Sequence, residues 1–409
     1  MRLTSSGPAI LVTAAFIGPG TVITASRAGA DYGLALLWAL VFSVLATMIL
    51  QEMTGRLGIV TKQGLGENIR ASMNNSLSRW LAIVLVTSAI VIGNAAYQGG
   101  NITGAVLAIA PIVIIPNVTL GVEISSWSLI IGLIALVILW RGQYSLIETS
   151  LKLLVGLMSL AFIATFFMTL TNPFDLLSGL IPSIPDGATL TIIALIGTTV
   201  VPYNLFLHSA ACAEKWRASE SVATALAQSR HDIKLAIPLG GLISIAIMST
   251  AASAFFASQI ELVNLATLSP SLEPTMGKAA PYIMATGLFA AGISSAITAP
   301  LAAAFALRGI LGLNNQLTDW SFRAIWLTIL LLGMGVSALQ MRPVNIIWFA
   351  QVANGLLLPI ITSYLIWVMN SDTLGQFKNN RLQNILGLFV LSVALLLSGR
   401  SLMSAFGLL

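Results

Sequence analysis

The sequence predicts an all-α polytopic membrane protein with eleven spans, two of which are broken near the middle. Three observations lead to this fold class. Hydrophobic residues make up 57% and charged residues 8% of the 409 residues, whereas soluble domains carry about 25% charge. Eleven apolar runs reach the length of roughly 17–25 residues that a bilayer requires. Proline interrupts the first and the sixth of these runs, which occupy matching positions in two halves of five spans.

The spans form a single transmembrane domain over residues 1–409, because no connection between them is long enough for a separate domain. We expect the first five spans (about 8–170) and the next five (about 187–370) to form two inverted repeats, followed by an additional helix. The spans lie near 8–30, 34–58, 79–109, 124–140, 143–170, 187–213, 233–257, 279–307, 323–340, 344–370 and 382–406.

The first span contains Gly-Pro-Gly-Thr at 18–21, and the sixth contains Val-Pro-Tyr-Asn at 201–204. Proline removes a backbone donor and glycine loosens the helix, so we expect the first span to consist of two halves, at 8–17 and 22–29. A membrane interior accepts such loose backbone only where protein or a water-filled cavity surrounds it. Paired interruptions of this kind indicate the substrate site of an inverted-repeat transporter.

The basic residues gather on one side of the membrane when the N-terminus is placed in the cytoplasm. Fifteen of the 19 then face inward, which predicts a cytoplasmic N-terminus and an external C-terminus in the cytoplasmic (inner) membrane. The net charge of +5 therefore reflects basic loops beside the lipid bilayer and not nucleic-acid binding.

One cysteine and two histidines predict no metal cluster. Since we find no nucleophile–base pair or nucleotide loop, we expect neither an enzyme nor a cofactor. A monomer is compatible with the sequence.

Three stretches of the sequence resemble the Nramp family. They are Ile-Gly-Pro-Gly-Thr at 17–21, Arg-Ala-Gly-Ala-Asp-Tyr-Gly at 27–33, and the run 197–209, which contains Pro-Tyr-Asn-Leu-Phe-Leu-His-Ser. The resemblance extends over essentially the whole chain. It implies the LeuT-type fold and proton-coupled transport of divalent metals.

The chain departs from this family at the positions that the resemblance assigns to the metal. The family's first-helix motif is Asp-Pro-Gly-Asn, and its two metal ligands correspond here to Gly18 and Thr21. The methionine of the family's sixth-helix Met-Pro-His motif corresponds to Val201. Acidic residues of the family's third helix correspond to Asn94 and Tyr97. The resemblance therefore implies that each of these family ligands is lost.

The groups that remain around the two breaks are neutral and form hydrogen bonds, which favours a polar ligand over an ion. A divalent cation is costly to bury without charged ligands. We therefore expect a secondary transporter that has lost metal-ion transport, shows weak or no proton coupling and carries a small neutral polar solute, such as a sugar or polyol, by alternating access. The predicted substrate-binding residues are Gly18, Thr21, Asn94, Tyr97, Gln98, Thr198, Val201, Tyr203 and Asn204.

Two alternative functions remain open at this point. One is a divalent metal transporter for Mg²⁺ or Mn²⁺ with an unorthodox site, for example one that holds the ion through water. The other is a scaffold or receptor that does not transport. If protons are coupled to transport, His208 is the candidate, because it lies one turn after Asn204 and imidazole titrates near neutral pH.

Overall fold

The computed structural model is almost entirely helical and describes residues 7–9, 13, 17–73, 75–119, 121, 123–142, 145–170, 172–219, 221–260, 265–313, 319–339 and 343–405. Within these residues, nine helices are long and apolar enough to cross a membrane. A further apolar helix of 16 residues, α6 (Ser126–Arg141), accounts for the fourth predicted span. The predicted all-α fold class is confirmed.

The other helices that correspond to predicted spans are α2 (Pro19–Tyr32), α3 (Leu37–Thr61), α5 (Ser76–Ile109), α7 (Ser145–Thr169), α9 (Thr189–Thr199) with α10 (Pro202–Lys215), α11 (Val222–Ala251), α13 (Ala280–Leu311), α14 (Trp320–Ala338), α15 (Pro343–Met369) and α16 (Arg381–Ala405). The connections contain shorter elements, which are α4 (Leu65–Ala71), the antiparallel pair β1 (Val118–Thr119) and β2 (Glu123–Ile124), α8 (Pro173–Gly179), the π-helix η1 (Ala252–Phe256), η2 (Leu265–Ser271), α12 (Glu273–Met276), η3 (Gly277–Ala279) and η4 (Asp372–Phe377).

The break in the first span lies where the sequence predicts it. Gly18 has an extended backbone, with φ −116° and ψ −176°, and α2 begins at the next residue, Pro19. Proline suits this position because a helix has no partner for its first N–H groups. The second half therefore starts at residue 19 and not at 22. Of the predicted first half, 8–17, only residues 8, 9, 13 and 17 are among the described residues.

The break in the sixth span has the same construction. Helix α9 ends at Thr199, Val201 has an extended backbone with φ −80° and ψ 121°, and Pro202 begins α10. The backbone N–H of Asn204 donates to the backbone carbonyl of Val201 at 3.0 Å, which closes the first turn of α10. In both spans, an extended residue directly precedes the proline that begins the second helix.

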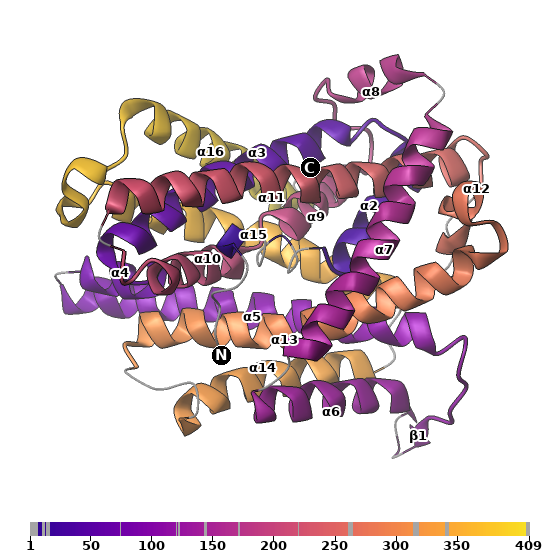
Figure 1. Cartoon of the computed structure of the whole chain (residues 1–409), viewed down its shortest axis with the longest axis horizontal. Coiled ribbons are helices and arrows are strands. Elements are labelled where there is room, and N and C mark those ends of the chain that lie inside the picture. Colours follow the sequence, from indigo (N-terminus) through magenta and orange to yellow (C-terminus); the bar gives the residue numbers. More distant parts are fainter. Residues whose placement is uncertain are drawn as a thin grey trace.

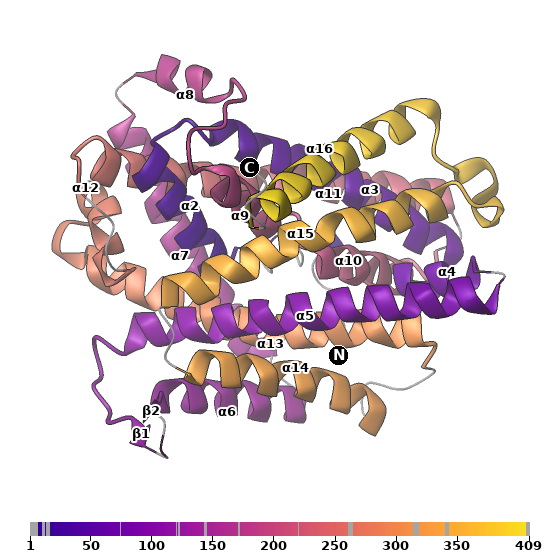
Figure 2. The ribbon, with the colours of Figure 1, turned by 180° about the vertical axis from the view of Figure 1, so that it is seen from behind.

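Helix α5 runs through the middle of the molecule and packs against α13, α14 and α15 (Figures 1 and 2). Small residues allow these helices to approach closely, which is the usual basis of helix packing in membranes. For example, a Cβ atom on Gly292 of α13 would lie 2.6 Å from the Cβ atom of Ala105 on α5. On the other side, α10 and α11 pack against α3, and α11 also contacts α2.

The connections gather at two opposite ends of the molecule. Figure 1 shows α4 and the connection between α15 and α16 at the left end, and α8, α12 and β1 at the right end. The predicted order of spans requires this separation. It places α4 and the connection between α15 and α16 on one side of the membrane, and α8, α12 and β1 on the other.

Candidate functional site

The two broken helices are joined directly by a buried hydrogen bond. The hydroxyl groups of Thr21 on α2 and Thr198 on α9 lie 2.8 Å apart, and both side chains are fully buried. The two residues come from different breaks and are 177 positions apart in the sequence. The predicted convergence of the two breaks is therefore present in the structure.

Tyr97 of helix α5 packs against the second break. The rings of Tyr97 and of Tyr203, the second residue of α10, meet edge to face with their centroids 5.5 Å apart. A Cβ atom on Gly18 would lie 3.8 Å from the Tyr97 hydroxyl and 2.8 Å from Oγ of Ser295 on α13. Side chains of α5 and α13 thus occupy the space beside Gly18.

Several polar atoms near the breaks are buried and have no hydrogen-bond partner among the described residues. The amide of Asn94 donates to the Ile90 carbonyl at 2.9 Å, but its Oδ1 has no partner, and Asn204 has no partner for either side-chain atom. Ser295 Oγ is also unpartnered. Because buried polar groups in proteins are nearly always satisfied, these atoms are free to bind a ligand or water.

Gln98 of α5 contacts the helices α13 and α14. Its amide donates to the carbonyl of Ala296 on α13 at 2.9 Å, and a Cβ atom on Gly333 of α14 would collide with its side chain. Its Oε1 has no partner. Gln98 therefore occupies the contact between α5, α13 and α14, whereas Val201 lies at the second break as predicted.

His208 lies at the contact between α10 and α3. Its Nδ1 atom is 3.1 Å from Thr54 Oγ1, and its Nε2 atom is 3.7 Å from Cys212 Sγ. The side chain is fully buried. Both ring nitrogens thus have neighbours that can hold them in place, and the role of His208 in proton coupling stays a prediction.

Sequence reasoning missed two residues that belong to this region. Ser295 faces Gly18, and Asn354 of α15 has an unpartnered Nδ2 atom and an Oδ1 atom 3.2 Å from where a Cβ on Gly93 of α5 would lie. Asn354 is only 1% exposed. An asparagine inside an apolar span was the available signal, since polar side chains in membranes join helices or bind ligands.

All nine predicted substrate-binding residues are buried. These nine residues therefore have little contact with solvent in this conformation. Among the described residues, no group of three or more His, Cys, Asp or Glu side chains is placed to hold a metal ion. The available donors are therefore neutral amide, hydroxyl and backbone oxygens.

Comparison with known proteins identifies a matching family model and relatives that share one name. The Nramp family model, described as natural resistance-associated macrophage protein-like, matches residues 9–404. The divalent metal cation transporter MntH of Verminephrobacter eiseniae is 29% identical over 384 residues, which cover 93% of this chain and 84% of that protein. The MntH protein of Acidiphilium cryptum is 28% identical over 366 residues, covering 88% and 81%.

Two solved structures share the fold. The Eremococcus coleocola manganese transporter, in complex with an aromatic bis-isothiourea substituted compound, has a TM-score of 0.72 at 22% identity and covers 98% of this chain and 86% of its own. The inward-facing conformation of Mhp1 has a TM-score of 0.56 at 13% identity, with coverage of 97% and 90%. These likenesses confirm the predicted LeuT-type fold.

The prediction of a small neutral polar solute, and of lost metal-ion transport, is wrong. The relatives are named divalent metal cation transporters, and the solved neighbour is a manganese transporter. The prediction rested on the missing donors at Gly18, Thr21 and Val201. That reasoning gave hydration too little weight and left the hydrated ion as an alternative, although a hard cation such as Mg²⁺ keeps several of its own waters when it binds to a protein.

Proposed function

The chain belongs to the Nramp family, and we propose that it carries a divalent metal cation through the site between its two broken helices. It is a multi-pass membrane protein of a transporter family and not an enzyme. The observation that carries the proposal is the convergence of both breaks, joined by Thr21 and Thr198, beside buried oxygens that have no partner.

The chemistry of these donors favours a hard cation that keeps part of its water shell. Mg²⁺ and Mn²⁺ prefer oxygen ligands, which are carboxylate, carbonyl and water, whereas thiolate and thioether ligands select softer ions. Asn94, Asn204 and Ser295 offer neutral oxygens, and the last carbonyls of α9 lack helical partners because the helix ends there. Retained waters spread the charge of the ion and reduce the cost of burying it.

A neutral site also sets the expected affinity. Without a carboxylate, binding depends on ion–dipole contacts alone. We therefore expect a dissociation constant on the order of millimolar, which corresponds to a binding free energy of about −4 kcal/mol. This range separates the proposed site from one that contains acidic ligands.

The burial of the residues at the two breaks fits a transporter that opens to one side at a time. We propose that residues 8–170 and 187–370 are inverted repeats and that rocking of one group of helices against the other exposes the breaks alternately. We expect this movement to change the contact between Tyr97 of α5 and Tyr203 of α10, whose rings now meet edge to face.

Uptake into proteoliposomes tests the proposal. Liposomes that contain the purified protein and an internal Mn²⁺- or Mg²⁺-sensitive dye should show saturable uptake at millimolar concentrations, and protein-free liposomes should not. Asn204→Leu should reduce uptake at least tenfold, because it removes a buried amide oxygen. Asn117→Leu, in the exposed connection before β1, is the matched control and should retain full uptake.

The proposal fails if neither Mn²⁺ nor Mg²⁺ enters liposomes that contain folded protein, as judged by a cooperative thermal transition. It fails equally if Asn204→Leu and Asn117→Leu transport at the same rate, since the ion would then pass by another route.

We also propose that the N-terminus and the end of the molecule with α4 face the cytoplasm, since most basic residues gather there. Cys212, the only cysteine in the sequence, is fully buried and gives little background labelling. Membrane-impermeant maleimide should label Asn117→Cys but not Ala218→Cys in intact cells, and the opposite pattern would reverse the orientation.

A further inference from the structure

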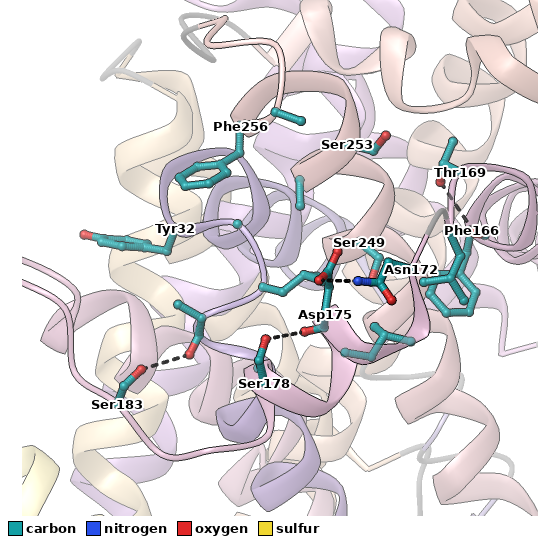
Figure 3. A pocket seen from close by; sticks show the side chains of 18 residues that line it. Tyr32, Phe166, Thr169, Asn172, Asp175, Ser178, Ser183, Ser249, Ser253 and Phe256 are labelled. Atoms are coloured by element: carbon teal, nitrogen blue, oxygen red, sulfur yellow. Dashed lines mark hydrogen bonds between the residues drawn. The ribbon is translucent and has the colours of Figure 1, made fainter.

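A cavity of about 550 Å³ lies at the far end of α2, away from the break. It is partly open and is lined by the end of α2, the end of α7, the short helix α8 and the π-helix η1 (Figure 3). Helix α2 has 14 residues, so this cavity is about 20 Å along the helix from Pro19. Its volume lies in the range of small-molecule sites.

The charges around this cavity favour a cation. Asp175 of α8 is among the lining residues, and its Oδ1 atom accepts a hydrogen bond from Asn172 at 3.1 Å. No Lys, Arg or His side chain is among the described residues of the lining. Helices α2 and α7 both end at the cavity, and the C-terminal end of a helix carries partial negative charge.

Aromatic side chains form much of the wall. Tyr32, Phe166 and Phe256 all line the cavity and are labelled in Figure 3. The faces of aromatic rings attract cations, and their area suits an apolar body. Gly33, with φ +59°, allows the chain to turn here, and a Cβ at this position would lie 2.9 Å from the Phe256 ring.

A buried hydroxyl in the same wall lacks a partner. Ser249 lines the cavity and is only 9% exposed, and its Oγ forms no hydrogen bond with the part of the chain that the structure describes. A buried hydroxyl without a partner is unfavourable, and an ammonium group would satisfy it as a donor. The adjoining π-helix η1, Ala252–Phe256, is a second unusual feature, because π-helical turns are rare and are frequently found at functional sites.

We propose that this cavity is a second ligand site, separate from the two breaks, which binds a small organic ammonium compound with an aromatic or apolar body. The ammonium group lies near Asp175 and donates to Ser249, and the body packs against Tyr32, Phe166 and Phe256. A divalent metal is a poorer fit, since one carboxylate supplies most of the charge and the walls are aromatic. An anion is disfavoured by the absence of a basic side chain in the described lining.

Three probes of similar size and different charge test this proposal by calorimetry on the purified full-length protein. Benzylamine, protonated at pH 7, should bind, whereas benzoate and the neutral benzyl alcohol should bind at least tenfold more weakly. Asp175→Asn should weaken benzylamine binding at least tenfold. Asp186→Asn, an exposed residue of the neighbouring loop that is not in the lining, should leave binding unchanged.

Ser249→Ala is a second test, which does not depend on the fold of α8. The variant should be at least as stable as the unaltered protein without ligand, and it should bind benzylamine more weakly. Equal binding of benzylamine and benzyl alcohol would overturn the proposal, and so would full binding by Asp175→Asn or by Ser249→Ala. These outcomes are independent of metal uptake and therefore of the function proposed above.

Discussion

At the scale of single residues, Asn204 combines full burial with two unpartnered side-chain atoms. If its oxygen faces a divalent ion, Asn204→Asp adds a negative charge where the ion binds. We expect this variant to bind Mn²⁺ roughly tenfold or more tightly, and to melt at a lower temperature without metal, because an unpaired buried charge is costly. Thermal shift against Mn²⁺ concentration measures both effects. If Mn²⁺ does not restore the melting temperature of the variant, Asn204 lies outside the ion site.

The hydroxyl pair Thr21 and Thr198 should stabilise the closed arrangement of the breaks. Valine has nearly the shape of threonine but cannot form the hydrogen bond, which contributes on the order of 0.5–1.5 kcal/mol. We expect Thr21→Val and Thr198→Val each to lower the melting temperature, and the double variant to lose less than the sum of the two. Additive losses in this double-mutant cycle would mean that the 2.8 Å contact contributes nothing to stability.

At the scale of helices, the start of α2 depends on Gly104 of α5. A Cβ atom at Gly104 would collide with the ring of Pro19, the first residue of α2. We expect Gly104→Ala to cost roughly 1–3 kcal/mol, as overpacking generally does, and to slow metal uptake because it displaces the first break.

Gly156 of α7 provides the matched control for this prediction. No atom lies within 4 Å of the position that its Cβ would occupy, so Gly156→Ala should be neutral or stabilising by up to about 1 kcal/mol. Melting temperatures of the two variants in the same detergent measure the difference. If both substitutions have the same effect, close packing of α5 on α2 does not position the break.

At the scale of the whole molecule, Arg56 joins three parts of the end that carries α4. Its guanidinium pairs with Glu52 at 3.1 Å and donates to the carbonyl of Phe377 in η4 at 2.6 Å and to Asn379 at 2.7 Å. Glu52 also pairs with Arg230 of α11 at 2.9 Å. Helices α3 and α11 are thereby tied to the segment between α15 and α16.

Because Arg56 is only 3% exposed, Arg56→Met should be costly. Removal of one partner from a buried ionic network costs on the order of 3 kcal/mol. Arg217→Met is the control, since the pair of Arg217 with Glu214 is exposed and such surface pairs contribute about 1 kcal/mol or less. A comparison of the two melting temperatures tests this, and equal losses would contradict a structural role for the network.

The sequence by itself determined the spans, the two breaks and the family. These features are local, because the length of an apolar run decides whether a segment can cross a membrane, and proline interrupts a helix wherever it lies. Pro19 and Pro202 therefore identified both breaks, although the exact helix starts depended on which residue took the first helical position. Motif resemblance around these prolines was sufficient for the family, but missing ligands at Gly18 and Val201 led to the wrong substrate class.

Only the tertiary structure decided which side chains meet. The contact between Thr21 and Thr198 crosses 177 positions, and nothing in either segment indicates the other's distance or orientation. Packing of the helices joined Gln98 to the Ala296 carbonyl of α13 and brought Ser295 to Gly18. The cavity beside Asp175 and Ser249 arises from the ends of helices that are distant in the sequence. Such sites depend on how helices pack, and packing is a property of the folded chain that no single segment contains.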